Sequence, residues 1–177
     1  MTSGSEVQFK PVPVVTHKGR ELEVRPFERA DFGALVQMYK SFEPKRVAQG
    51  IPPPDVPRIA LWLDRLERKS HALLAWEGNK VVAHTILCPM PANAVEFTIF
   101  VHQDYRQEGL GTALSRLTLG WALQMGLTHA YLTTETSNFR ALRLFRKLGF
   151  QTTSNYGDEV EMKLDLSSSE CERPQAA

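Results

Sequence analysis

The period of hydrophobic and polar positions changes several times along this chain of 177 residues. Residues 21–27 alternate between polar and apolar side chains, and this period of two predicts a half-buried strand. Apolar side chains then recur at helical spacing within residues 30–42 and within residues 59–66, which predicts two helices. Asp55 is a favoured cap residue for the start of the second helix, and Pro57 suits its first turn.

The rest of the chain predicts a hairpin followed by a crossover. The expected elements are strands at 71–77, 80–88 and 95–101, a helix at 109–125, a strand at 129–134, a short helix between Asn138 and Gly149, and strands at 150–153 and 160–164. The first two strands flank Gly78-Asn79, a tight-turn pair, and Pro89 is expected to end the second. Because hairpins precede a strand–helix–strand crossover, we predict an α/β domain with a mixed sheet.

Three regions follow from this pattern. Residues 1–20 are expected to form an N-terminal arm or edge strand, because prolines interrupt their apolar positions. Residues 21–166 hold the single expected domain, and residues 167–177 form a polar tail. Within the domain, residues 44–57 are a proline-rich loop that is long for a compact fold, and such loops are either disordered or functional.

Charge and composition exclude several classes of protein. Lysine and arginine total 21 against 20 aspartate and glutamate, so the chain lacks the basic excess expected of a nucleic-acid binder. We also expect no membrane association and a cytoplasmic protein, because no apolar run is long enough for a span and no secretory signal opens the chain. Two cysteines make no disulfide framework, and the five histidines never pair at metal-ligand spacing, so we expect no metal.

The stretch from Val101 to Leu114 carries the most chemical information. A strand ends there, a polar turn follows, and Gly109 and Gly111 open an amphipathic helix. The unpaired amides and the positive dipole end of a helix N-terminus attract anions, and glycines let phosphate oxygens approach the backbone. The same glycines also suit close packing of strand against helix, so a structural role is the alternative to phosphate binding.

Other phosphate-binding motifs fit this stretch poorly. It contains no Gly-Lys-Ser/Thr, which excludes a P-loop NTPase. A Rossmann fingerprint needs a third glycine where Leu114 stands. Glu135 does occupy the approximate position of a ribose-binding acid, but several strands precede the motif, so a Rossmann protein is the weaker interpretation.

Two segments of this chain resemble signatures of one family. Residues 106–111, Arg-Gln-Glu-Gly-Leu-Gly, resemble the Arg/Gln-x-x-Gly-x-Gly/Ala signature of the GNAT family of N-acetyltransferases. Residues 138–150 resemble its second signature, Asn-x-x-Ala-x-x-Leu-Tyr-x-x-x-Gly-Phe. The resemblance implies an acyl-CoA N-acyltransferase fold, in which about four helices flank a central mixed sheet. Strands 95–101 and 130–134 would run parallel and then splay apart.

The resemblance also implies acetyl-CoA as co-substrate. The pantetheine arm would enter the gap between the splayed strands, and the pyrophosphate would lie on backbone amides of the glycine-containing turn. The expected cofactor-binding residues are Phe100, Val101, Arg106, Gln107, Gly109, Leu110, Gly111, Thr112 and Asn138. Asn138 would cap its helix and could also reach the cofactor, although Asn is a favoured N-cap without any ligand.

Acetyl transfer to an amine needs a general base near the thioester carbon. Glu96 is the catalytic candidate, because it lies on the strand expected to line the site between apolar Val95 and Phe97. Partial burial there would raise its pKa. The alternatives are that Glu96 faces solvent or serves an ion pair, with Glu135 as the second acidic candidate.

The chain departs from the family pattern at two positions. Phe145 stands where the second signature has Tyr, the usual proton donor to the departing thiolate, so water or one of Tyr105, Tyr131 and Tyr156 would have to serve. Thr133 stands where ribosomal-protein N-terminal acetyltransferases carry Glu, which disfavours that subclass.

These observations predict an N-acetyltransferase that moves an acetyl group from acetyl-CoA to a primary amine by direct attack. The acceptor is a small-molecule amine or a protein lysine, and the sequence does not choose between them. The alternative is a CoA-binding sensor or non-catalytic module, which the missing tyrosine makes worth testing. The expected partners are acetyl-CoA and the amine, with a homodimer left open.

Overall fold

The computed structural model describes residues 7–47 and 49–168, so most of the expected polar tail lies outside the described residues. The strands are β1 (Val12–Val15), β2 (Glu21–Pro26), β3 (His71–Glu77), β4 (Lys80–Met90), β5 (Ala94–Val101), β6 (His129–Glu135), β7 (Gln151–Tyr156) and β8 (Glu159–Asp165). The helices are α1 (Phe32–Ser41), α2 (Val56–Glu67), α3 (Leu110–Gln124) and α4 (Phe139–Lys147), with single 3-10 turns at Arg29–Asp31 and Gln103–Tyr105. The predicted order of elements is confirmed.

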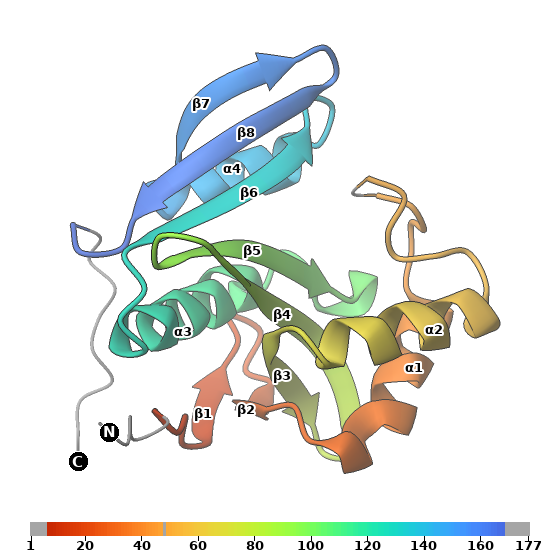
Figure 1. The fold of residues 1–177 in the computed structure, drawn as a ribbon. Coiled ribbons are helices and arrows are strands. Elements are labelled where there is room, and N and C mark those ends of the chain that lie inside the picture. Colours follow the sequence, from red (N-terminus) through yellow and green to blue (C-terminus); the bar gives the residue numbers. More distant parts are fainter. Residues whose placement is uncertain (1–6, 48, 169–177) are drawn as a thin grey trace.

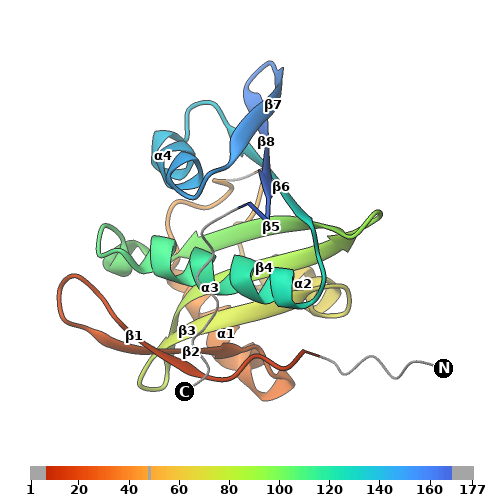
Figure 2. The ribbon, with the colours of Figure 1, turned by 90° about the vertical axis from the view of Figure 1, so that its left-hand side faces the viewer.

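All the strands join one eight-stranded sheet in the order β1-β2-β3-β4-β5-β6-β8-β7. Only β5 and β6 pair in parallel, and every other neighbouring pair is antiparallel. The sheet is therefore mixed, as predicted. The helices cover it unevenly: α3 packs on one face, α1 and α2 lie on the other, and α4 lies behind β6 and β8 (Figures 1 and 2).

The prediction that Pro89 ends its strand is wrong. β4 continues to Met90, and Pro89 lies opposite Val95 of β5. The neighbouring strand β3 reaches only as far as Leu87, where His71 faces it. Beyond that point one side of β4 is an edge, and an edge tolerates a residue that has no N–H to donate.

Two hydrophobic clusters hold these layers together. On one face, α1 and α2 bury aromatic and aliphatic side chains against β3, β4 and β5, with Tyr39, Phe42 and Ile59 almost fully inaccessible. On the other face, α3 and α4 pack against the sheet, with Leu114 fully buried. Asp55 caps α2 as predicted, because its Oδ1 accepts a hydrogen bond from the Arg58 N–H at 3.0 Å.

The predicted splay between the parallel strands is confirmed. β5 and β6 pair only at Ala94–His129, Val95–Ala130 and Glu96–Tyr131. Beyond these pairs β5 stays with β4 as far as Val101, while β6 stays with β8 as far as Glu135. The two halves of the sheet therefore diverge from a shared hinge line, which is visible between β5 and β6 in Figure 1. None of the helices within residues 7–47 and 49–168 is long and apolar enough to cross a membrane.

Candidate active site

A small cavity of about 90 Å³ opens where β5 and β6 part. Both strands, the start of α4 and the loop between α1 and α2 contribute to its walls. The lining residues are Val47, Gln49, Ile51, 96–100, 132–134, Asn138, Ala141 and Phe145. The gap is therefore a partly open space with room for a small acyl group, and we call it the splay cavity.

Glu96 lines the splay cavity but is not buried as predicted. Its side chain is exposed, whereas Val95 and Phe97 on either side are buried. Alternate residues of a strand point to opposite faces, so the apolar neighbours of Glu96 cannot cover it. The prediction of partial burial is wrong for this reason. The position at the start of the gap still leaves the carboxylate accessible to a substrate.

The turn before α3 holds a run of unpaired backbone amides. Within the part of the chain that the structure describes, none of the N–H groups of residues 107–112 donates a hydrogen bond, and α3 begins its own ladder with Ala113 N–H to Gly109 C=O at 3.1 Å. Gln107 and Gly109 both adopt left-handed backbone conformations, with φ of 61° and 82°. Such turns make concave clusters of N–H groups that bind anions. We call residues 106–112 the phosphate loop.

The two glycines of the phosphate loop differ in what they require. Gly109 needs glycine because of its positive φ. The exposed His17 ring lies 2.5 Å from where a Cβ would be and would have to turn away. At Gly111 a Cβ would lie 3.5 Å from Leu144 and 3.8 Å from Val101, which is ordinary contact. Packing of strand against helix therefore does not demand glycine at residue 111, and this favours the phosphate-binding interpretation there.

Two other predicted contacts of this loop face inward. The Arg106 Nε donates to the Val101 carbonyl at 2.9 Å, and its guanidinium lies 5.1 Å from the ring centroid of Phe42. The Leu110 side chain is buried in the core, so only its amide can meet a ligand. Arg106 therefore ties the loop to the end of β5.

Arg140, in the first turn of α4, is a residue that the sequence analysis missed. Burial lowers the pKa of Arg106, and the positive charge of Arg140 lowers it further. The two cations therefore repel each other, and a bound anion would relieve that repulsion. The signal available in the sequence was the position of Arg140 two residues after Asn138, inside the second signature.

Asn138 caps α4 and also borders the splay cavity. Its Oδ1 accepts from the Ala141 N–H at 3.2 Å, which confirms the predicted N-cap. The side-chain amide Nδ2 has no partner among the described residues. Both predicted roles are therefore sterically compatible.

Phe145 is 6% exposed and belongs to an aromatic group beneath the gap. Its ring centroid lies 6.4 Å from that of Phe97 and 5.8 Å from that of Phe150, and it also lines the splay cavity. A hydroxyl added at its ring edge would therefore stand between core and cavity.

The three candidate tyrosines lie in different places. The Tyr105 hydroxyl donates to Glu77, and burial together with that contact raises its pKa to about 12. Tyr156 is exposed on the outermost strand, β7. Tyr131 faces Glu96 across the last parallel pair and has Lys163 Nζ 5.4 Å from its ring centroid. None of the three is among the residues that line the splay cavity, although Tyr131 directly precedes Leu132, which does line it.

The proline-rich loop between α1 and α2 reaches the splay cavity. Val47, Gln49 and Ile51 line it, and Gln49 Nε2 donates to Glu159 Oε1 at 3.2 Å. In Figure 1 this loop rises toward the end of β6. The loop therefore closes one side of the gap and links the two halves of the sheet.

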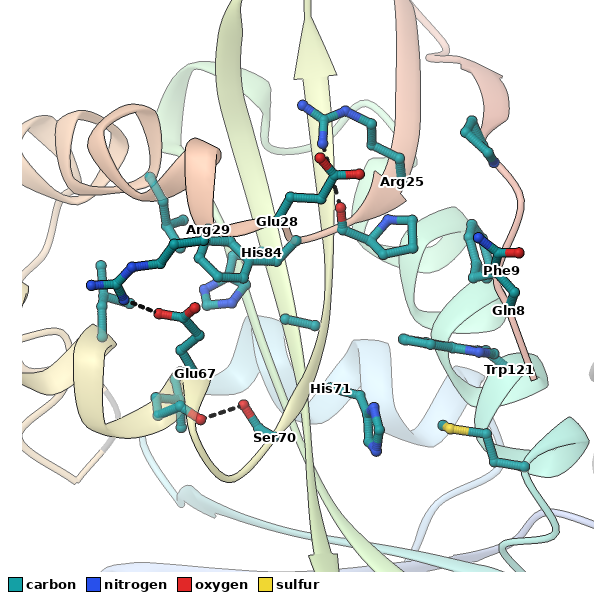
Figure 3. Close-up of a pocket in the computed structure, with 18 of the residues that line it drawn as sticks. Gln8, Phe9, Arg25, Glu28, Arg29, Glu67, Ser70, His71, His84 and Trp121 are labelled. Atoms are coloured by element: carbon teal, nitrogen blue, oxygen red, sulfur yellow. Dashed lines mark hydrogen bonds and ion pairs between the residues drawn. The ribbon is translucent and has the colours of Figure 1, made fainter. Parts of the chain in front are cut away.

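A larger cavity, of about 860 Å³, shares no lining residue with the splay cavity or the phosphate loop (Figure 3). The Arg29–Glu67 ion pair borders it on one side, and the rings of His71 and Trp121 face it on the other. No group of three or more metal-ligating side chains occurs within the described residues.

A parallel strand pair that parts beside a loop of unpaired amides at a helix N-terminus defines an α/β protein suited to an anionic coenzyme. Residues 34–150 match the Acetyltransferase (GNAT) family, and the chain belongs to this family. The predicted family is confirmed.

Individual relatives agree with this assignment. The chain is 28% identical over 97 residues to N-acetyltransferase family 8 member 2 of Rattus norvegicus, covering 51% of this chain and 43% of that protein. It is 29% identical over 101 residues to the ribosomal protein bS18-alanine N-acetyltransferase of Escherichia coli (strain K12), covering 51% of this chain and 68% of that protein. The chain thus spans less than half of the rat relative.

A solved structure shares the fold. The crystal structure of the GNAT domain of S. lividans PAT superposes with a TM-score of 0.78 at 20% identity, covering 88% of this chain and 96% of that one. At this identity the likeness establishes the arrangement of strands and helices alone.

Proposed function

We propose that this chain is an N-acetyltransferase that transfers the acetyl group of acetyl-CoA to a primary amine by direct attack. The observation that carries the proposal is the run of unpaired amides at residues 107–112 beside the splay cavity. A coenzyme with a diphosphate and a long amide-containing arm requires that combination.

The phosphate loop would hold the diphosphate of the coenzyme. The amides of Gln107, Gly109, Gly111 and Thr112 are free to donate to its oxygens, and the N-terminal dipole end of α3 adds a favourable field. The positive charge of Arg140, which acts on Arg106 of this loop, would add to the attraction of an anion. These contacts would anchor the coenzyme without using the reacting atoms.

The arm of the coenzyme would then enter the splay cavity along β5. Between Phe97 and Val101 this strand has no partner on its β6 side, because the parallel pairing stops at Glu96. Its backbone N–H and C=O groups on that side are therefore available to the amide groups of pantetheine. Of the two residues predicted for these contacts, Val101 presents its backbone groups to the open side, where its carbonyl also accepts from Arg106 Nε at 2.9 Å. The register in which His102 N–H donates to the Val82 carbonyl turns the backbone groups of Phe100 toward His84 of β4.

In the reaction, the amine nitrogen attacks the thioester carbon and the carbon–sulfur bond breaks. Glu96, directly or through a water, would take the proton that the amine loses. A backbone N–H at the splay would stabilise the negative charge that develops on the carbonyl oxygen. Phe145 has no proton to give, the Tyr105 hydroxyl already donates to Glu77, and neither Tyr131 nor Tyr156 lines the splay cavity. We therefore assign protonation of the departing thiolate to water.

The acceptor is a small-molecule amine or a protein lysine. The rival is a CoA-binding module that has lost catalysis. Calorimetric titration with acetyl-CoA, combined with a thiol-release assay over a broad amine panel, separates the two. Binding with amine-dependent release supports the enzyme, binding without release supports the module, and absence of binding contradicts both.

A further inference from the structure

The connection between β1 and β2 is a short, well-defined turn. Thr16 N–H donates to the Arg20 carbonyl at 3.0 Å, Gly19 N–H donates to the Thr16 carbonyl at 2.9 Å, and Gly19 has a φ of 78°. This is the geometry of a hairpin closed by a glycine bulge. We call residues 16–20 the hairpin tip, and Figure 2 shows it extending toward the start of α3.

Among the described residues, the hydrogen bonds and ion pairs between the hairpin tip and the phosphate loop all involve Glu108. His17 N–H donates to the Glu108 carbonyl at 2.8 Å. Thr16 Oγ1 donates to Glu108 Oε2 at 3.0 Å, and Arg20 Nε lies 3.2 Å from the same oxygen. Lys18 Nζ lies 3.3 Å from Oε1. The tip therefore holds the main chain and the side chain of one residue at once.

A carboxylate in this position is unexpected in an anion-binding loop. The Glu108 side chain is fully buried, and a bare negative charge there would oppose a diphosphate. Burial alone would raise the pKa of Glu108, but the contacts with Thr16 and Lys18 and the charge of Arg20 hold it below its ordinary value. Lys18 and Arg20 thus neutralise the charge that the loop carries.

The conformation of the loop gives a reason for this arrangement. Glu108 lies between Gln107 and Gly109, both left-handed, and a left-handed non-glycine residue persists only where its surroundings hold it. The hairpin tip supplies that restraint, and the His17 ring occupies the space beside Gly109. Without the hairpin tip, the unpaired N–H groups of the phosphate loop would no longer all point toward the same site.

We propose that the hairpin tip is a positioning element for the coenzyme, which keeps the amides of the phosphate loop aimed at the diphosphate through Glu108, with Thr16 as the central positioning residue. This inference rests on the proposed function. The hairpin tip precedes residue 34, where the match to the family begins, so it is a feature that the family match does not include.

Thr16→Val tests the inference, because valine keeps the shape and removes the hydroxyl donor. We expect the dissociation constant of CoA, measured by calorimetry, to rise about tenfold. Thr16→Ser restores the hydroxyl and should return the constant to within about twofold of the original.

Thr85→Val is the matched control. Thr85 is likewise buried, and its hydroxyl shares a 2.7 Å hydrogen bond with Thr118. Among the described residues, no side-chain hydrogen bond joins either threonine to the phosphate loop. We expect it to lower the melting temperature while leaving CoA affinity within about twofold. Equal CoA affinity in Thr16→Val and the parent, or an equal loss in Thr85→Val, would overturn the positioning role. Failure of the parent protein to bind CoA would instead overturn the proposed function, and the inference with it.

Discussion

Glu96 and Tyr131 are the last two residues to face each other across β5 and β6 before the strands part. The pair therefore marks the origin of the splay cavity, and it lies on the sheet face that carries Phe100 and Thr98. A base at this point stands beside any acyl group held in the gap. The position of Glu96, rather than its burial, is what makes it the candidate.

Replacing Glu96 with glutamine should slow turnover about 100-fold, within the range that a general base contributes. Because the side chain is exposed and lies away from the phosphate loop, CoA affinity and melting temperature should stay unchanged. Steady-state rates across pH check the prediction, since the acidic limb of the profile should disappear. If that limb survives at the same pH, the base lies elsewhere, with Glu135 next to be tested.

Gly111→Val should raise the dissociation constant of acetyl-CoA by about tenfold or more. The new Cβ would point toward the side chains of Val101 and Leu144, beside the amides proposed for the diphosphate, at ordinary contact distances of 3.8 and 3.5 Å. The fold should therefore survive, as circular dichroism and melting can verify. Unchanged affinity in a folded variant would remove residue 111 from the site. Gly109→Val is less informative, because the left-handed backbone and the His17 ring make that variant strained.

Phe145→Tyr places a hydroxyl at the border between the aromatic core and the splay cavity. An unpaired buried hydroxyl costs about 1–3 kcal/mol, so the free protein should melt earlier. Bound CoA would offer its sulfur as a partner, and the loss should then be offset, with thiol release equal to or faster than that of the parent. A variant that is less stable and slower even with CoA present would show that residue 145 does not face the sulfur.

The free energy of unfolding should decrease as the pH falls below about 6.5, because of His84. This ring is 2% exposed, its Nδ1 is 2.8 Å from the Tyr39 hydroxyl, and burial lowers its pKa to about 3. The unfolded chain binds a proton near pH 6.5 whereas the folded chain does not, so protonation favours unfolding as the pH falls. From pH 7 to pH 5 this amounts to about 2 kcal/mol. Urea unfolding should show that the free energy of unfolding of His84→Gln decreases by about 2 kcal/mol less than that of the parent between pH 7 and pH 5. A variant with the same pH dependence as the parent would contradict the prediction.

The sequence predicted the elements because period, caps and turn residues are local signals. The N-cap at Asp55, the N-cap at Asn138 and the splay all appear where expected. The burial of Glu96 was predicted wrongly, because flanking apolar residues in a strand belong to the opposite face. The contact of Thr16 with Glu108 joins residues 92 positions apart, and local sequence patterns cannot predict a contact at that separation.

Titration of the ¹⁵N-labelled protein with CoA, followed by amide NMR, tests the binding of coenzyme on the phosphate loop most directly. The amides of residues 107–112 have no acceptor among residues 7–47 and 49–168, so their resonances should move the most and downfield, as new hydrogen bonds to the diphosphate form. Adenosine diphosphate should move the same resonances, because it carries the same group. If CoA binds while these amides stay unchanged and the largest shifts fall elsewhere, the phosphate loop is not the coenzyme site.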